Sequence, residues 1–186
     1  MGLEIFFKDI KTPITIIHVI SVVFGMGSAL VSDLLFSIFS RDKQLNDTEI
    51  HTLSVLSKVV HYSLIVIILS GAAIFFSDTY KYMHSVKFLA KMSIILVLFI
   101  NGYILSKRIW PSIVADRFFY LRKEGNIRKT AFACGAISVT SWIFVCALGV
   151  LDKATIGYFA IIGIYLLLVF LGILISLFVE KSVFKE

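Results

Sequence analysis

Five long apolar segments take up most of this sequence and leave little chain between them. They cover residues of about 13–39, 50–77, 85–110, 129–150 and 154–179. A helix needs roughly 20 consecutive apolar residues to cross the hydrocarbon layer of a bilayer. The chain as a whole is 59% hydrophobic, which is above the usual range of a soluble domain. The sequence therefore predicts one all-α membrane domain, residues 1–186, built as a polytopic bundle of five transmembrane helices.

Positively charged residues concentrate in the connection that follows the third segment. They are Lys107, Arg108, Arg117, Arg122, Lys123, Arg128 and Lys129. Short loops rich in Lys and Arg stay in the cytoplasm, so we expect a cytoplasmic basic loop at 107–129, with the N-terminus out and the C-terminus in. This predicts a multi-pass protein of the cell inner (plasma) membrane. The net charge of +6 is then mainly a topology signal and an attraction to anionic lipid headgroups, and it does not indicate nucleic-acid binding.

Several ionisable side chains fall inside the apolar segments, and they are the first candidates for a functional site. They are His18, Asp33, Lys58, His61 and Lys91. A charged group in the hydrocarbon layer is costly unless it faces the bundle interior, pairs with another group or lines a water-filled cavity. The fold therefore has to supply partners, water or a cofactor for these groups.

The depth of each polar group follows if consecutive helices run antiparallel and lie side by side. Residues at equal depth then have numbers that sum to about 89 for the first two helices and about 161 for the second and third. This arithmetic predicts two polar layers. The outer layer contains His18, Ser70, Gly71 and Lys91. The inner layer contains Asp33, Lys58, His61 and Asn101.

The inner layer has a structural interpretation as well as a functional one. Asp33 and Lys58 fall at one depth, which favours a structural ion pair in which each charge offsets the cost of the other. His61 falls opposite Asn101, which predicts an interhelical hydrogen bond. The same four residues could instead form a polar path for protons or ions across part of the membrane.

The outer layer suits a cofactor or simple packing. Gly71 and the two alanines after it are expected to leave open space level with His18, which a flat cofactor or a closely packed helix could use. Lys91 lies near a helix start, where its side chain can snorkel to the outer surface. A bis-histidine haem is not expected, because His18 and His61 differ in depth by on the order of 15 Å. His18 is therefore the single axial, metal-binding ligand predicted for a haem, with Lys91 at the same level.

Two segments resemble a known family. ITIIHVISVVFGMG contains His18, and FLAKMSIILVLFINGY contains Lys91. Together they resemble the membrane core shared by HemJ-type protoporphyrinogen oxidases and the copper-resistance CopD domain. The resemblance covers residues of about 10–110 and implies that His18 and Lys91 take part in binding haem b. Leu89 and Asn101 stand where HemJ-type proteins have histidines, so the resemblance implies the wider haem or copper membrane group rather than protoporphyrinogen oxidation.

Two functions from different classes follow. The first is an integral membrane haem b protein, a candidate membrane oxidoreductase, that transfers electrons between a membrane carrier such as quinone and a redox partner. The alternative is a small proton or ion channel or transporter subunit that uses Asp33, Lys58, His61 and Asn101. An assembly protein with purely structural polar pairs is a third interpretation. The expected partners are the lipid bilayer, a quinone or other redox partner, and further copies of the chain.

Overall fold

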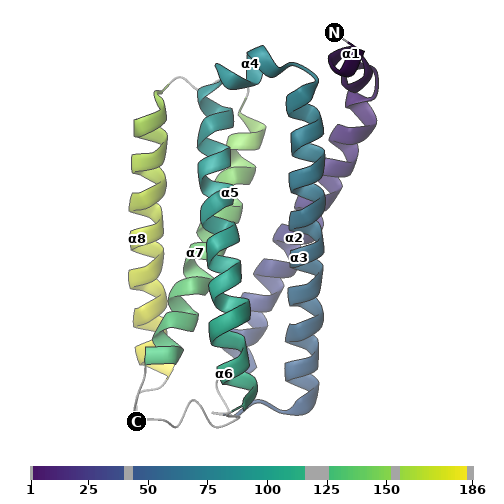
Figure 1. The fold of residues 1–186 in the computed structure, drawn as a ribbon. Helices are drawn as coiled ribbons and strands as arrows, with labels where there is room; N and C mark the ends of the chain where they lie inside the picture. Colours follow the sequence, from purple (N-terminus) through teal and green to yellow (C-terminus); the bar gives the residue numbers. More distant parts are fainter. Residues whose placement is uncertain (1, 40–43, 116–125, 152–155, 184–186) are drawn as a thin grey trace.

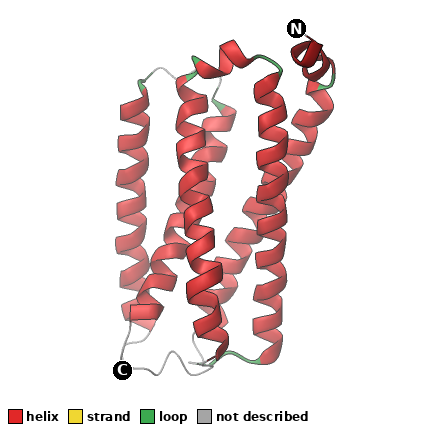
Figure 2. Ribbon diagram, viewed as in Figure 1, coloured by secondary structure: helices red, strands yellow, loops and turns green. Residues whose placement is uncertain are grey.

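The computed structural model describes residues 2–39, 44–115, 126–151 and 156–183, and all regular structure in these ranges is helical (Figure 2). The elements in chain order are α1 (Gly2–Asp9), α2 (Lys11–Phe39), α3 (Asp47–Phe76), α4 (Thr79–Met83), α5 (Val86–Ile104), the π-helical turn η2 (Leu105–Ile109), α6 (Trp110–Ala115), α7 (Asn126–Val150) and α8 (Tyr158–Val183). Five helices in this set are long and apolar enough to cross a membrane. The predicted all-α, five-helix class is confirmed, and the chain is a multi-pass membrane protein by helix length and hydropathy.

The third spanning helix is longer than the sequence predicted. It continues through η2 and α6 to Ala115, whereas the expected end was near residue 110. Pro111 explains the π turn, because its ring crowds the carbonyl four residues earlier and it has no N–H to donate. A wider turn directly before it relieves that crowding. The predicted loop at 107–129 is therefore wrong at both ends, since α7 begins at Asn126; residues 116–125 lie outside the described part of the chain.

The other helix ends have local causes in the sequence. Asn46 accepts a hydrogen bond from the Glu49 N–H at 2.9 Å, and Glu49 accepts one from the Asn46 N–H at 2.9 Å. Because of this capping box, α3 begins at Asp47, about one turn before the predicted start of the apolar segment at residue 50. At the C-terminus of α3 the Ser77 hydroxyl donates to the Ile74 carbonyl at 2.6 Å. The Ser85 side chain caps the N-terminus of α5.

The five long helices form two groups that meet at α7. Helix α2 packs antiparallel along α3, while α5 and α8 both pack on α7, and α2 closes the bundle against α7 (Figure 1). Helix α5 makes its main contacts with α7 rather than with α3, although only α4 separates α3 from α5 in the chain. The N- and C-termini lie at opposite ends of the bundle (Figure 1). The N-terminus-out orientation remains a prediction.

One buried cluster holds the two groups together at mid-height. It contains Ala29, Leu64, Ile67, Leu98 and Trp142, which come from α2, α3, α5 and α7. Trp142 is only 3% exposed, and Gly25 of α2 provides the room for its ring: a Cβ atom on Gly25 would lie 2.9 Å from the indole. This close approach places α7, and the polar residues it carries, directly against α2.

Candidate functional site

Three residues of the predicted outer layer, His18, Ser70 and Gly71, lie in contact. His18 Nδ1 lies 2.9 Å from Ser70 Oγ, joining α2 to α3. The Ser70 hydroxyl also lies 2.5 Å from the Val66 carbonyl. A hydroxyl has one proton to donate, and a carbonyl can only accept, so Ser70 donates to Val66 and accepts from His18. His18 Nδ1 therefore carries the proton, and Nε2 keeps its lone pair.

Gly71 plays a different part from the one expected of it. A Cβ atom at Gly71 would lie 3.5 Å from His18 Cε1, so the imidazole edge rests directly over this glycine. The space beside Gly71, which the sequence predicted as open to a flat cofactor, is occupied by the His18 ring. The contact is ordinary van der Waals packing, which favours the close-packing interpretation of Gly71.

Lys91 points to the end of α7. Its Nζ lies 3.8 Å from where a Gly149 Cβ would be, beside the last turn of that helix. One turn earlier on α5, Lys87 donates to the Leu151 carbonyl just beyond α7. The last carbonyls of a helix lack intrahelical partners and carry partial negative charge, so they stabilise nearby ammonium groups. The shared level of His18 and Lys91 remains a prediction.

The predicted ion pair between Asp33 and Lys58 is wrong. Asp33 Oδ2 is buried without a hydrogen-bond partner among the described residues, and Lys58 is exposed on the outside of α3. The depths match, but the directions do not. Successive helical residues point about 100° apart, and it is Ser57 rather than Lys58 that faces the interior. Asp33 faces α7 instead: a Cβ on Gly135 would lie 3.2 Å from Asp33 Oδ1.

The predicted hydrogen bond between His61 and Asn101 is also wrong. Asn101 is buried and its Nδ2 donates to the Cys134 carbonyl of α7 at 2.9 Å. His61 Nδ1 donates to the Ser57 carbonyl of its own helix at 2.7 Å. The physical reason is that α5 packs on α7. An asparagine that points from α5 into the bundle therefore contacts the α7 backbone and not α3.

Three of the four inner-layer residues nevertheless border one partly open cavity of about 70 Å³, which we call the polar cavity and which lies among α2, α3, α5, η2 and α7. Its polar side chains are Ser32, Asp33, Ser57, His61, Asn101, Ser106, Ser138 and Trp142. A water molecule needs roughly 10–15 Å³ of such space together with polar partners, so this cavity is large and polar enough to hold several waters. Lys58 is absent from its lining.

Two buried polar atoms of the cavity residues have no hydrogen-bond partner within the described chain. They are Asp33 Oδ2 and Trp142 Nε1. The indole N–H can only donate, and an ionised carboxylate oxygen can only accept. A water or hydroxyl group satisfies both, because it accepts from one and donates to the other. Leaving such groups unpaired costs about 1–3 kcal/mol each, and more for a charge. Asp33 and Trp142 are therefore the two lining residues with a buried polar atom that still needs a partner.

Sequence reasoning missed several members of this cavity. Ser57, Ser138 and Trp142 were not singled out, because hydroxyl residues inside an apolar helix usually bond to their own backbone. A usable signal was present in α7, where Ser138, Ser141 and Trp142 share one face. The π turn η2 also contributes to the lining through Leu105 and Ser106, and π turns are frequent at functional sites.

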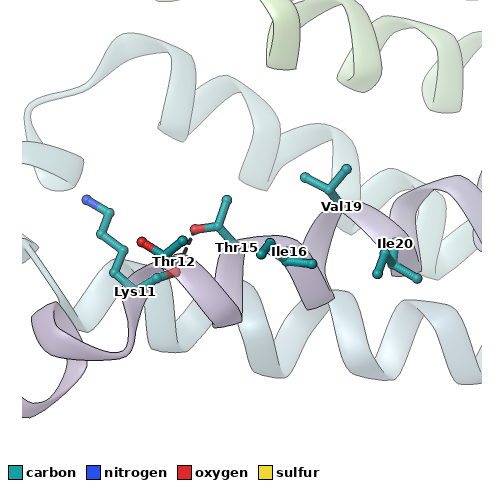
Figure 3. Close-up of a pocket in the computed structure, with 6 residues that line it drawn as sticks. All are labelled: Lys11, Thr12, Thr15, Ile16, Val19 and Ile20. Atoms are coloured by element: carbon teal, nitrogen blue, oxygen red, sulfur yellow. Dashed lines mark hydrogen bonds between the residues drawn. The ribbon is translucent and has the colours of Figure 1, made fainter.

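Other places in the fold are less suited to chemistry. Within the described ranges no three His, Cys, Asp or Glu side chains gather as a metal-binding group. Figure 3 shows an open groove along α2 that is lined by Lys11, Thr12, Thr15, Ile16, Val19 and Ile20. Its walls come from one helix, and the Thr15 hydroxyl is already engaged with the Lys11 carbonyl at 2.8 Å. We interpret it as lipid-facing surface.

Comparisons of the chain with protein-family models, with curated proteins and with solved structures found no match. The haem and copper resemblance therefore stays a prediction, and the case for a function rests on the geometry of this chain. Two places remain for that case: the His18–Ser70 pair and the polar cavity at Asp33.

Proposed function

We propose that this membrane protein binds and transfers protons inside the bilayer, with Asp33 as the proton-binding residue. The observation that carries the proposal is the Asp33 carboxyl group, which is buried at the polar cavity without a hydrogen-bond partner on Oδ2. An uncompensated carboxylate is expensive at this depth, so the group is held at the expense of stability. Such residues mark proton relays in pumps and transporters.

The cavity chemistry favours a proton over a metal ion. Among the described residues the lining offers one carboxylate, Asp33, and no group of three His, Cys, Asp or Glu side chains that could hold a metal ion, and the Trp142 N–H needs an acceptor. Water suits that donor, and Asn101, Ser57 and Ser138 add further hydrogen-bonding groups around it. A hydrated cavity lets a proton move between water molecules and the Asp33 carboxyl group. His61 borders the cavity and is exposed on α3, so its imidazole lies at the edge of this space.

The test is proton flux in liposomes that contain the purified protein. A pH-sensitive dye inside the vesicles should report proton entry when a potassium gradient and valinomycin set a negative interior. We expect Asp33→Asn to reduce the flux at least tenfold, because an amide cannot exchange a proton under these conditions. Asp9→Asn is the matched control, because Asp9 is an exposed carboxylate at the end of α1 and should leave the flux unchanged.

A second substitution tests the cavity rather than the carboxyl group. Gly102 borders the cavity, and a Cβ added there meets nothing within 4 Å. Gly102→Leu should therefore fill the cavity and lower the flux while the protein stays folded. Flux that persists unchanged in both Asp33→Asn and Gly102→Leu would contradict the proposal.

A second candidate function is haem b binding and electron transfer with a carrier such as quinone. The specific observation in its favour is the hydrogen bond from His18 Nδ1 to Ser70, because a histidine that ligates a metal through Nε2 usually donates its other ring N–H. The His18 imidazole could serve as a single axial ligand. The surface at Gly71 does not fit the haem macrocycle, because the His18 ring already covers it. A bound haem would supply one-electron redox chemistry.

An absorption spectrum separates the two candidates. Protein purified from cells supplied with haem precursor should show a Soret band that shifts on reduction if haem is bound, and His18→Ala should remove that band. His61→Ala is the control and should keep it, because His61 bonds within its own helix. A colourless preparation at good yield would exclude the haem candidate and leave proton transfer.

A further inference from the structure

We infer that Asp33 also binds the cationic head of an amphipathic molecule that enters from the bilayer, so that the protein exchanges a lipophilic cation for a proton. The inference rests on the proposed proton-binding role of Asp33 and names the substrate class that would be coupled to it. Its basis is a second hollow that Asp33 also borders, between α2, α7 and α8, whereas the polar cavity lies among α2, α3, α5 and α7.

The second hollow is a groove of about 290 Å³ between α2, α7 and α8. Its walls are mostly apolar, and they carry a few hydroxyl groups and several small residues. The lining is Asp33, Phe36, Ser37, Phe132, Gly135, Ala136, Val139, Thr140, Gly172, Ile175, Ser176 and Val179. Small-molecule sites have this composition, with a largely hydrophobic lining and a few polar groups that fix orientation.

The groove lies at membrane depth. Asp33 precedes the end of α2 at Phe39 by six residues, or about 9 Å along the helix axis. The other walls belong to two helices long and apolar enough to span the bilayer, α7 and α8. A hollow between such helices is reached from the hydrocarbon layer, so its occupant needs an apolar body.

Asp33 belongs to both hollows. It borders the polar cavity with Asn101 and Trp142, and it borders the groove with Gly135 and Ala136. The Asp33 Oδ1 atom lies over Gly135, where even a methyl group would be 3.2 Å away. The glycine therefore lets the carboxyl group lie between α2 and α7, where it can be approached from either side.

Charge complementarity selects the class of occupant. In the described part of the chain Asp33 has no cationic partner, and Lys58, which the sequence assigned to that role, faces outward. An ammonium head brought in by a lipophilic molecule supplies the missing positive charge, and its apolar chain lies along Phe36, Val139 and Ile175. A neutral amphiphile can make the same apolar contacts with the groove walls, but it leaves an ionised Asp33 without a compensating positive charge.

Competition for one carboxyl group produces coupling. A proton that arrives through the cavity neutralises Asp33 and releases the cation, and a cation that arrives through the groove displaces the proton. The titratable groups facing Asp33 are His61 at the cavity, on α3, and the Cys134 thiol on α7. Helix α5 presents the uncharged Asn101, and α8 presents Ser176 to the groove.

The probe for the test is dodecyltrimethylammonium, with 1-dodecanol as a neutral molecule of the same chain length. The full-length protein in lipid nanodiscs is titrated calorimetrically at several pH values, and proton release is followed with an indicator dye in weak buffer. We expect saturable binding of the cation at pH 8 that weakens by up to about tenfold per pH unit as Asp33 takes up its proton. One proton is released for each cation bound where Asp33 starts protonated.

Asp33→Asn should lower the cation affinity at least tenfold and leave dodecanol partitioning unchanged. Equal cation binding in wild-type and Asp33→Asn nanodiscs would overturn the inference, as would dodecanol binding that depends on Asp33. Because Asp33→Asn is also predicted to stop proton flux, a groove variant is needed to separate the two proposals.

Ala136→Leu serves this purpose, since Ala136 borders the groove and is absent from the lining of the polar cavity. It should reduce cation affinity while proton flux in the absence of cation persists. Gly135→Ala should also weaken cation binding, and Gly163→Ala is its control because a Cβ at Gly163 has open space around it. Asp33-dependent proton flux without any cation binding would overturn this inference and leave the proton-transfer proposal intact; a wild-type protein that shows neither Asp33-dependent flux nor cation binding would overturn both.

Discussion

The partners of a side chain in this protein depend on the direction in which it points as much as on its depth. Asp33 and Lys58 lie at matching heights on neighbouring helices, yet one faces α7 and the other the outside of α3. The Asp33 carboxyl group therefore lowers stability, because its Oδ2 is buried without a hydrogen-bond partner among the described residues. Gly25 shows the opposite case, in which one missing side chain is required for stability.

Gly25 and Gly27 provide a matched pair of substitutions on α2. A Cβ at Gly25 would meet the Trp142 ring at 2.9 Å and Ser63 at 3.0 Å, whereas one at Gly27 meets nothing within 4 Å. Gly25→Ala should destabilise the protein by about 1–3 kcal/mol through overpacking. Gly27→Ala should be neutral or stabilising by up to about 1 kcal/mol, because alanine favours the helix. Thermal unfolding in detergent measures both, and equal effects would show that α2 does not approach α7 at Gly25.

At the scale of helices, α7 organises the bundle. It contacts α2, α5 and α8, and it carries Trp142, Gly135 and the carbonyl that Asn101 binds. Its pairing with α8 is fixed by polar contacts spaced along the helices. The Ser141 hydroxyl lies 2.8 Å from the Tyr165 hydroxyl, Ser176 donates to the Phe132 carbonyl at 2.7 Å, and Arg128 pairs with Glu180.

The Arg128–Glu180 pair should be important for α7–α8 packing. Glu180 is only 3% exposed and lies near the C-terminus of α8, beside the N-terminus of α7. Each charge is opposed by the dipole of its own helix, and both the neighbouring helix end and the partner charge offset that cost. Breaking a buried pair on one side costs about 3–5 kcal/mol. Glu180→Gln should lower the unfolding free energy by an amount of that order in denaturant titrations.

Lys129→Gln is the control for this change, because Lys129 is the exposed neighbour of Arg128. It should leave stability within about 0.5 kcal/mol of the parent protein. A Glu180→Gln protein as stable as Lys129→Gln would mean that the pair contributes nothing at the membrane boundary.

At the scale of the whole molecule, an odd number of spanning helices places the two termini at opposite ends of the bundle (Figure 1). Both hollows beside Asp33 lie nearer the end that carries the C-terminus. If the positive residues set the orientation, this is the cytoplasmic end, and protons would reach Asp33 most readily from the cytoplasm.

Cysteine labelling in intact cells tests that orientation. The native Cys134 and Cys146 are first replaced by alanine, and single cysteines are then introduced at Tyr80 or Lys129. Tyr80 is 78% exposed on α4, at the end where α3 finishes and α5 begins. We expect a membrane-impermeant maleimide to label Tyr80→Cys in intact cells and Lys129→Cys only after permeabilisation. The opposite pattern would reverse the predicted topology.

Much of the fold could be predicted because it depends on local properties of the chain. The length of apolar runs set the five helices, and the positions of Asn46 and Ser85 set where two of them begin. The His18–Ser70 contact could also be predicted, since α2 and α3 are consecutive and pack along their length. Depth arithmetic works for such a pair because both helices rise by the same distance per residue.

The candidate site required the tertiary structure, because it depends on which helices are neighbours and how each is rotated. The sequence placed Asp33, His61 and Asn101 at nearly one depth but assigned them the wrong partners. The partner assigned to Asp33, Lys58, faces outward from α3, and the pairing of His61 with Asn101 assumed that α5 packs beside α3. Instead α7 lies between the two helix groups, takes the Asn101 hydrogen bond and brings Trp142 to the cavity. Apolar periodicity alone does not fix helix rotation in a bilayer, where lipid and protein interior are both apolar. The sequence by itself determined a five-helix membrane protein with a carboxyl group at membrane depth, and only side-chain packing around α7 decided that this group would lie unpaired between two hollows.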